Sequence, residues 1–348
     1  MIVAGLCGFL VYSAAAQPTF TTFQISGGDT WPTAINNAGI ITGYAGENYT
    51  GFLGFTYAAG GAVSQFSAAS SPYLVETFAS SINKAGTVVG YFSEYTAPPT
   101  EGGIDLSHCF MRDSSATITT FDAPGAGTTE DSQGTLCTCI ITGGAVAGYY
   151  VATNTAQGFL LSPSGRFTSF APSGAVYTYP TSINAGGSIA GYYADADNVD
   201  HGFVRTAGGI VTFEMPGAIR TQAFAINSKG TITGTYTDTN NITHGFVRSS
   251  DGTITTFDAP GAGTGKSYGT IATGISEGGE IAGYFSDPEG RSHGFVRSAG
   301  GRITPFEAPG AASGPNVGTW ALAISPSGAI AGYYSDTGGA VHGFLRTP

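Results

Sequence analysis

The sequence predicts an all-β protein: a seven-bladed β-propeller with four antiparallel strands per blade, in a ring closed by the N-terminal strand, which completes the last blade. A phrase ending in Gly-Tyr, such as INKAGTVVGY at Ile82–Tyr91, recurs along the chain. The glycine of that step (followed by Thr in one copy) falls at Gly43, Gly90, Gly148, Gly191, Gly234, Gly283 and Gly332. Seven copies at this spacing, each with four strand-like runs, indicate propeller blades.

The fifth copy shows the four runs of one blade in order. They read AFAIN, TITGTYT, HGFVRS and TITTFDAPG, and they are rich in the β-branched and aromatic residues that favour strands. Asn227–Gly230 fits a type I turn followed by a left-handed glycine, and Ser250–Gly252 fits the same hairpin geometry. No apolar pattern of helical period and length occurs, so we expect almost no helix.

The two ends of the chain predict how the ring closes. The seventh copy stops at His342–Pro348 and lacks its fourth strand, whereas Thr19–Gly27 near the N-terminus matches the fourth strands of other copies. We therefore expect Thr21–Gln24 to pair with Gly343–Arg346. Closure of this kind removes a free sheet edge that would otherwise promote aggregation.

The first sixteen residues resemble a secretory signal. Met1–Ala16 is an apolar run that ends in small residues before Gln17, although it lacks the positively charged leading segment of such signals. We expect residues 1–16 to be a signal peptide and 17–348 to be a single propeller domain. The mature chain would then be secreted, periplasmic or extracellular, since no later stretch has the apolar length of a membrane span. We also expect it to be a monomer.

Composition excludes several classes of protein. The 348 residues include 55 Gly, 41% are hydrophobic and only 10% are charged, so the chain is not a disordered, solvated tail. Lys and Arg total 12 against 23 Asp and Glu, giving a net charge of −11. A chain with so few cations is a poor candidate for binding nucleic acid.

The cysteines suggest a disulfide and exclude a closed zinc site. If Cys7 leaves with the signal, Cys109, Cys137 and Cys139 remain. Cys137 and Cys139 alternate along a strand, so either could pair with Cys109 outside the cell, which leaves one thiol over. A closed zinc site needs four ligands.

The repeat phrases resemble a known family. I-N-x-x-G-x-I-x-G-Y followed by H-G-F-x-R is similar to the repeats of extracellular bacterial proteins of the HAF family, with Gly202, Gly245, Gly294 and Gly343 where the family has Ala. The first three copies depart from the pattern, for example with Leu53 or Gln157 in place of the His. The resemblance implies export and a β-repeat architecture, but no biochemical role.

Residues common to the copies are expected to be scaffold. The histidines share one slot on the third strand of each blade and cannot converge on one metal. Each of four copies has an Asp near the turn that leads back to the His, and an Arg four residues after the His, which predicts a polar brace of Asp, His and Arg in each blade. The histidines are His108, His201, His244, His293 and His342, and the aspartates are Asp195, Asp238, Asp287 and Asp336.

Departures from the repeat are the candidates for function. They gather at one end of the ring, where the largest insertion is Tyr95–Leu106. One slot at the entry to the innermost strands holds Trp31, Phe78, Leu136, Tyr179, Gln222, Ile271 and Trp320. Large aromatics in adjacent blades would form a stacking platform for sugar rings; the alternative is a hydrophobic lid between blades.

Polar residues outside the repeat gather on the same face. They are Asp29, Glu76, Glu130, Asp131, Arg220 and Lys266. Glu130 with Asp131 is the candidate carboxylate pair for acid–base chemistry on a glycosidic bond. No cofactor is required, although the oxygens of Asp195, Asp197 and Asp200 could hold Ca²⁺.

Two classes of function follow, and the residues leave open whether the protein is an enzyme. The first is an exported binding module for a glycan or cell-envelope component, with Trp31, Phe78, Tyr179 and Trp320 as the aromatic platform and Asp29, Arg220 and Lys266 as polar contacts. The alternative is a glycoside hydrolase or polysaccharide lyase that uses carboxylates at the mouth of the ring. A structural surface protein without a small ligand is the third possibility.

Overall fold

Strands are the only regular secondary structure in the part of the chain that the structure describes. This computed structural model describes residues 17–25, 28–47, 51–70, 75–97 and 101–348. The expected signal peptide, residues 1–16, lies outside the described residues, as does Cys7. Within the described ranges, no helix has the length and apolar character needed to cross a membrane.

The strands follow one another as hairpins. The first half comprises β1 (Thr19–Phe23), β2 (Asp29–Ile35), β3 (Ile41–Glu47), β4 (Gly51–Tyr57), β5 (Val63–Phe66), β6 (Val75–Ile82), β7 (Val88–Tyr95), β8 (Asp105–Arg112), β9 (Ile118–Phe121), β10 (Gln133–Ile140), β11 (Val146–Ala152), β12 (Thr155–Leu161), β13 (Phe167–Phe170) and β14 (Tyr177–Ile183). The second half comprises β15 (Ile189–Ala194), β16 (Asp200–Thr206), β17 (Gly209–Phe213), β18 (Ala218–Ile226), β19 (Ile232–Asp238), β20 (Thr243–Arg248), β21 (Ile254–Phe257), β22 (Gly269–Ile275), β23 (Ile281–Ser286), β24 (Ser292–Arg297), β25 (Ile303–Phe306), β26 (Thr319–Ile324), β27 (Ile330–Ser335) and β28 (Val341–Thr347).

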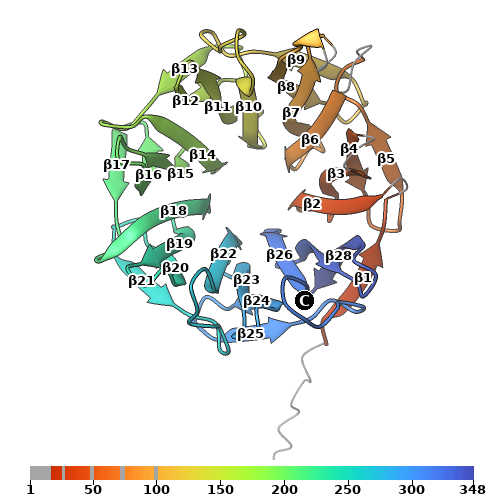
Figure 1. The fold of residues 1–348 in the computed structure, drawn as a ribbon, viewed down its shortest axis with the longest axis vertical. Helices are drawn as coiled ribbons and strands as arrows, with labels where there is room; N and C mark the ends of the chain where they lie inside the picture. Colours follow the sequence, from red (N-terminus) through yellow and green to blue (C-terminus); the bar gives the residue numbers. More distant parts are fainter. Residues whose placement is uncertain (1–16, 26–27, 48–50, 71–74, 98–100) are drawn as a thin grey trace, which may run out of the picture.

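Antiparallel pairing joins these strands in groups of four, named here by their first strand. The β2 group is β2-β3-β4-β5, the β6, β10, β14, β18 and β22 groups follow the same order, and the β26 group is β26-β27-β28-β1. Short parallel bridges such as β8–β10 and β12–β14 link some neighbouring groups into larger sheets. Figure 1 shows the groups arranged in a circle with the first strand of each group innermost.

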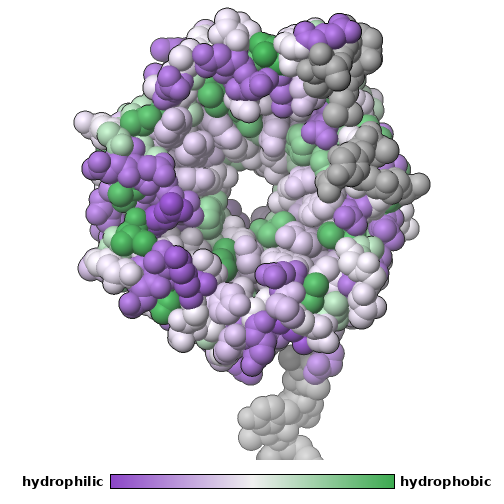
Figure 2. All heavy atoms as spheres, in the orientation of Figure 1, coloured by the Kyte–Doolittle hydropathy of each residue, from purple (hydrophilic) through white to green (hydrophobic). Residues whose placement is uncertain are grey.

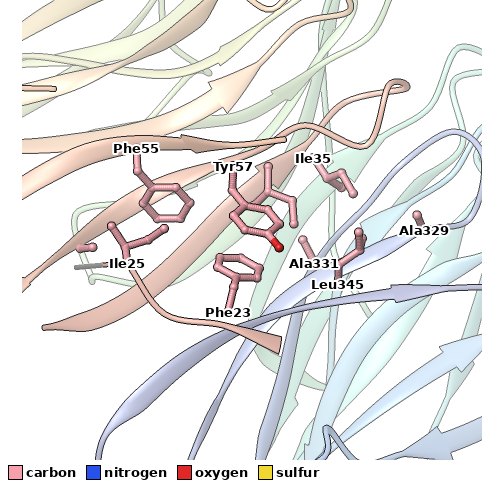
Figure 3. Packing of buried hydrophobic residues seen from close by; sticks show 10 residues of the cluster. Phe23, Ile25, Ile35, Phe55, Tyr57, Ala329, Ala331 and Leu345 are labelled. Carbon is pink, nitrogen blue, oxygen red and sulfur yellow. The ribbon is translucent and has the colours of Figure 1, made fainter. Parts of the chain in front are cut away.

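The N-terminal strand lies in the same group as the C-terminal strand. β1 pairs antiparallel with β28, with Thr21 opposite Leu345 and Phe23 opposite Gly343, which confirms the predicted pairing. Phe23 also stacks on Tyr57 of the β2 group, with ring centroids 4.0 Å apart and planes inclined by 10°. Figure 3 shows these rings in the core between the two groups, beside Phe55.

A repeated contact between Gly and Phe forms the core of each group. The Gly of each Gly-Tyr step faces a Phe on the third strand, for example Gly90 opposite Phe110, and that Phe is 0% exposed. A Cβ at Gly90 would overlap the Phe78 carbonyl oxygen and meet the Phe110 ring. The innermost strand is bulged at this level, between Ala79 and Ser81. Glycine is therefore required by close approach of the backbone.

Hydrogen bonds between neighbouring groups also form at the innermost strands. Thr33, at the bulge of β2, donates its hydroxyl to the carbonyl of Ala79 in the β6 group at 2.8 Å. Asn36 donates its side-chain amide to the Asn83 carbonyl at 3.1 Å, while its Oδ1 accepts two N–H groups of its own turn. The repeated Asn of the I-N phrase thus caps a turn and joins two groups.

The histidines form braces within the five groups that contain one, as predicted for Asp and His. His201 contacts Asp195 through Nε2 at 3.1 Å and Glu214 of the outer strand through Nδ1 at 2.6 Å. It also stacks on Tyr193. The equivalent pairs are His108 with Asp122, His244 with Asp238 and Asp258, His293 with Asp287 and Glu307, and His342 with Asp336.

The prediction that Arg joins Asp and His in the brace is wrong. The Arg205 guanidinium lies 4.9 Å from the centre of the Phe170 ring, which belongs to the preceding group. Arg248 over Phe213 and Arg297 over Phe257 repeat the contact. The Arg side chain is long enough to leave its own group and cover an aromatic face, so it connects groups by a cation–π contact.

A disulfide resolves the alternatives left open for the cysteines. Cys109 on β8 is bonded to Cys137 on β10, so the bond joins neighbouring groups. Cys139 is free and fully buried, and burial raises the pKa of its thiol to about 12. The thiol of Cys139 is therefore unreactive at neutral pH.

We predict that Phe23→Ala destabilises the protein by about 3–5 kcal/mol, because it removes a buried ring from the contact between the β26 and β2 groups. Denaturant unfolding of both forms measures the difference. Val211→Ala is the control, since Val211 is 52% exposed and its truncation should change stability by about 0.5 kcal/mol or less. Equal effects of the two substitutions would contradict the prediction.

We predict that the aspartates of the braces stabilise the fold above acidic pH. The hydrogen bond from His342 and two backbone N–H groups lower the pKa of Asp336. A carboxyl whose pKa is lower in the folded state stabilises above its unfolded pKa of about 3.9 and loses that effect as pH falls through the folded value. Thermal melting should show a smaller loss of stability below pH 4 for Asp336→Asn than for the unmodified protein, and a parallel loss would contradict this.

Candidate functional site

The end of the molecule where the innermost strands begin carries the irregular residues; we call it the mouth face. Figure 2 shows an opening at the centre of the ring, bordered mainly by pale and green residues, with the most hydrophilic residues farther out. The opposite end carries the Asn turns described above. The mouth face is therefore where side chains outside the repeat can be presented on a rigid frame.

Cross-strand pairs of side chains, most of which include an aromatic residue, lie near the start of the innermost strands at the mouth face. In each pair, the slot residue of the innermost strand lies opposite the residue after the repeated Gly on the second strand. The pairs are Trp31–Tyr44, Phe78–Tyr91, Leu136–Tyr149, Tyr179–Tyr192, Gln222–Thr235, Ile271–Tyr284 and Trp320–Tyr333. We call this set the aromatic collar.

The collar is most continuous where the β2 and β6 groups meet. Trp31 stacks on Tyr44 at 5.4 Å, Tyr44 meets the edge of Phe78 at 5.1 Å, and Phe78 stacks on Tyr91 at 5.0 Å. Phe52 packs against Trp31, Tyr44 and Phe78. These rings are all partly exposed. They seal the contact between two groups and still present aromatic surface to solvent.

A hollow of about 350 Å³ adjoins this cluster, between the β6 and β10 groups. Phe78, Tyr91 and Tyr149 form its aromatic wall, and Glu76 and Asp105 supply carboxylates. Ser93 and Ser107 lie in register with Glu76 across β6, β7 and β8, so the three side chains share one face of the sheet. We call this space the acidic hollow.

Both carboxyls of the acidic hollow are held in an unfavourable environment. Burial raises the pKa of Glu76, and the negative charge of Asp105 raises it further. Burial also raises the pKa of Asp105, against a hydrogen bond from Ser93, and the Asp131 carboxylate adds to the rise. Asp105 Oδ1 is buried and accepts no hydrogen bond from any described residue. The missing hydrogen bond adds to the unfavourable environment of this carboxyl.

The tyrosines of the hollow act as neutral hydrogen-bonding groups. Burial, together with the neighbouring Tyr44, Glu76 and Asp105, raises the pKa of Tyr91 to about 12. Burial raises the pKa of Tyr149 as well. Neither hydroxyl has a hydrogen-bond partner within the described part of the chain. Each can therefore donate to or accept from a ligand at neutral pH.

The structure separates the predicted aromatic platform into parts. Phe78 lines the acidic hollow, whereas Trp31 does not line it and is connected to Phe78 through Tyr44 and Phe52. Trp320 stacks on Tyr333 at 4.9 Å, and no ring contact between described residues joins it to Trp31. Tyr179 meets the edge of Tyr149 at 5.0 Å, which extends the wall toward the β14 group.

The predicted carboxylate pair does not face one space. Glu130 accepts a hydrogen bond from the Gln133 amide at 3.1 Å, whereas Asp131 accepts the backbone N–H of Asp105 at 2.9 Å. Neither side chain lines the acidic hollow. The Glu130 carboxylate therefore binds a side-chain amide and the Asp131 carboxylate a backbone N–H, and the carboxyls that do share a hollow are Glu76 and Asp105.

The remaining predicted polar residues lie apart. Asp29 accepts the backbone N–H of Val341 at 2.8 Å and so joins the β2 group to the β26 group. Arg220 lines a second hollow, between the β18 and β22 groups, and Lys266 precedes Ser267 at its edge. Cation and carboxylate candidates thus occupy different parts of the mouth face.

Of the three aspartates considered for Ca²⁺, Asp195 and Asp200 have carboxylates with separate partners. Asp195 accepts the N–H groups of Asp197 and Val199 and contacts His201, while Asp200 accepts a hydrogen bond from Gln222 at 2.8 Å. Among the described residues, no three acidic, His or Cys side chains are grouped as a metal site would require. The segment from Asp195 to Asp200 therefore forms a turn, and Asp195 connects this turn to His201.

Sequence reasoning missed Asp105 and the collar tyrosines as site residues. Asp105 lies in the insertion Tyr95–Leu106, which was singled out as a loop without naming its carboxylate. Tyr91 and Tyr149 belong to the Gly-Tyr step and so looked like scaffold. A repeated residue such as this Tyr contributes to a specific site only where its neighbours differ from those in the other copies.

Comparison with solved structures identifies the fold as a β-propeller. Virginiamycin B lyase from Staphylococcus aureus matches with a TM-score of 0.58 at 11% identity, over 94% of this chain and 99% of the other. The BP39L lectin from Burkholderia pseudomallei matches with 0.55 at 9% identity, over 92% and 96%. The β-propeller domain of the Trilobed protease from Pyrococcus furiosus matches with 0.53 at 9% identity, over 91% and 94%.

These likenesses concern the fold alone, because identities of 9–12% do not carry function from one propeller to another. No family model matches the sequence, and no curated protein matches it either. The function must therefore be argued from the residues at the mouth face.

We predict that Asp105→Asn raises the melting temperature at pH 7 and leaves it unchanged at pH 3. The pKa of Asp105 is higher in the folded protein, so its ionisation opposes folding at high pH and has no effect below its unfolded pKa of about 3.9. Asp251→Asn is the control with the opposite sign, because backbone N–H groups lower the pKa of Asp251. A gain of equal size at both pH values would contradict the prediction.

Proposed function

We propose that this protein is an exported propeller of seven four-stranded blades that binds a glycan or another cell-envelope ligand at its mouth face. In this proposal each four-strand group is a blade, and β1 completes the blade of β26, β27 and β28. The pairing of β1 with β28 supports that closure. Each blade supplies one innermost strand to the mouth, so substitutions in single copies can build a site without disturbing the repeat.

The acidic hollow is the observation that carries the proposal. Its wall combines the rings of Phe78, Tyr91 and Tyr149 with the carboxyl groups of Glu76 and Asp105. Sugar rings present apolar C–H faces, which stack on aromatic rings, and hydroxyl groups, which donate to carboxylates. A concave space of this composition suits a saccharide unit better than a purely apolar ligand.

Export of the chain is supported by two features. The segment Met1–Ala16 has the composition of a secretory signal, and the Cys109–Cys137 disulfide belongs to oxidising compartments. We propose a secreted or periplasmic location, a monomeric chain and membership of the HAF-type repeat proteins. A ligand of the cell envelope would be accessible in either compartment.

The same hollow favours a carbohydrate-active enzyme as the second candidate. Glu76 and Asp105 both have a raised pKa, and a carboxyl with a raised pKa is the kind of group that donates a proton to a glycosidic oxygen. Release of reducing ends or unsaturated products from polysaccharides would identify hydrolase or lyase activity. Retention without product would identify a binding module.

The test is retention on a panel of immobilised polysaccharides and a glycan array. We predict that Phe78→Ala weakens binding of a retained glycan about tenfold or more, because the variant removes a ring of the hollow's wall. Trp320→Ala is the matched control, since Trp320 occupies the same slot on a different innermost strand and lies outside the hollow. Equal losses in both variants would contradict a site at the acidic hollow, and a chain that retains no glycan would favour the structural surface protein.

A further inference from the structure

A second hollow of about 350 Å³ lies on the mouth face, between the β18 and β22 groups. Its wall is formed by Ile219, Arg220, Thr237, Asn241, Thr243 and Ser267. It has no acidic lining residue and contains one cation. We call it the basic hollow.

The sheet itself aligns the side chains of the basic hollow. Arg220 on β18 lies directly opposite Thr237 on β19, which lies directly opposite Thr243 on β20. Directly opposed residues of antiparallel strands point to the same face. The N–H of Ser267 donates to the Asn241 carbonyl at 2.8 Å, so the segment before β22 closes one side of the hollow. The site is therefore held by backbone pairing.

Comparison between groups shows that this row departs from the repeat. The equivalent positions that open the innermost strands of the β10 and β22 groups are Gly134 and Gly269, and Glu76 holds the position in the β6 group. β18 also carries a bulge between Ala218 and Arg220, an irregularity that leaves Ile219 37% exposed. Folding of the blade requires none of these features at this position.

The polar side chains of the basic hollow have no hydrogen-bond partner in the described part of the chain, and the charge of Arg220 offsets part of the rise that burial gives the pKa of Asp200. The side chains of Arg220, Thr237, Asn241, Thr243 and Ser267 make no hydrogen bond or ion pair with other described residues. The nearest carboxylates are already engaged, Asp200 with Gln222 and Asp238 with its own turn and His244. Five groups that can donate hydrogen bonds thus face one space, and one of them is a guanidinium.

We infer that the basic hollow is a subsite for an anionic group, a carboxylate or sulfate, on an acidic glycan. The inference rests on the proposed function, which it makes more specific. A guanidinium binds such a group through two parallel hydrogen bonds, and hydroxyl and amide donors complete its coordination. The acidic hollow repels the same group, so the two hollows fix which part of the glycan lies at each.

The experiment compares two pairs of probes. One pair is an oligogalacturonate and its neutral methyl ester, and the other is a sulfated galactose oligosaccharide and its desulfated form. We expect the unmodified protein to bind the anionic member of at least one pair about ten- to a hundredfold more tightly, as expected for charge-assisted hydrogen bonds. The preferred pair distinguishes carboxylate from sulfate. Added salt should reduce the preference.

Variants at position 220 test the assignment. Arg220→Ala and Arg220→Gln should abolish the preference for the anionic member of the pair, while Arg220→Lys should retain part of it. Lys229→Ala is the control, because Lys229 is an exposed cation in the turn at the other end of β18. Arg220 is exposed, so the melting temperatures of its variants should match that of the unmodified protein.

The outcomes separate this inference from the proposed function. A preference that survives in Arg220→Ala overturns the subsite, as does equal binding of charged and neutral probes. Binding of glycans on the panel without any such preference leaves the proposed function standing. Failure to retain any glycan overturns the proposed function and the subsite together.

Discussion

The fold depends on one steric constraint: three strands must approach each other closely at the Gly of every Gly-Tyr step. On one side, the bulged innermost strand brings a carbonyl against the glycine, as Phe78 does at Gly90. On the other, a fully buried Phe such as Phe110 lies opposite it. No other residue leaves room for both neighbours. The bulge then frees Thr33 and its equivalents to bond the next group, so packing within a group and between groups has one origin.

Much of this architecture could be predicted from the sequence because its causes repeat. The four-strand rhythm, the absence of helix in the described residues and the pairing of β1 with β28 follow from periodic turns and from the matching chain ends. Contacts that depend on geometry between groups could not be predicted. Arg205 was assigned to the brace of its own group, yet its guanidinium covers Phe170 of the preceding one. Likewise, spacing alone could not choose between Cys137 and Cys139 as the partner of Cys109.

The location of the candidate site at the mouth face could be predicted from the sequence, but the set of residues that forms it could not. The face follows from where the repeats lose their regularity, and Phe78 and Arg220 follow from slots that vary between copies. Asp105 and Tyr91 could not be predicted in this way, because the contribution of a side chain to a site at the mouth face depends on which residues lie beside it on the neighbouring strands. One row of the sheet holds Glu76 in the β6 group and Arg220 in the β18 group. The same backbone therefore presents opposite charges at two places on one rigid rim.

The pairing of β1 with β28 also has a consequence for how the chain is made. Thr19 lies opposite Thr347, 328 residues later in the sequence, so β1 has no partner until β28 has been synthesised. Until then β1 is an exposed edge that other chains can pair with, and a native contact between strands so far apart in the sequence slows folding.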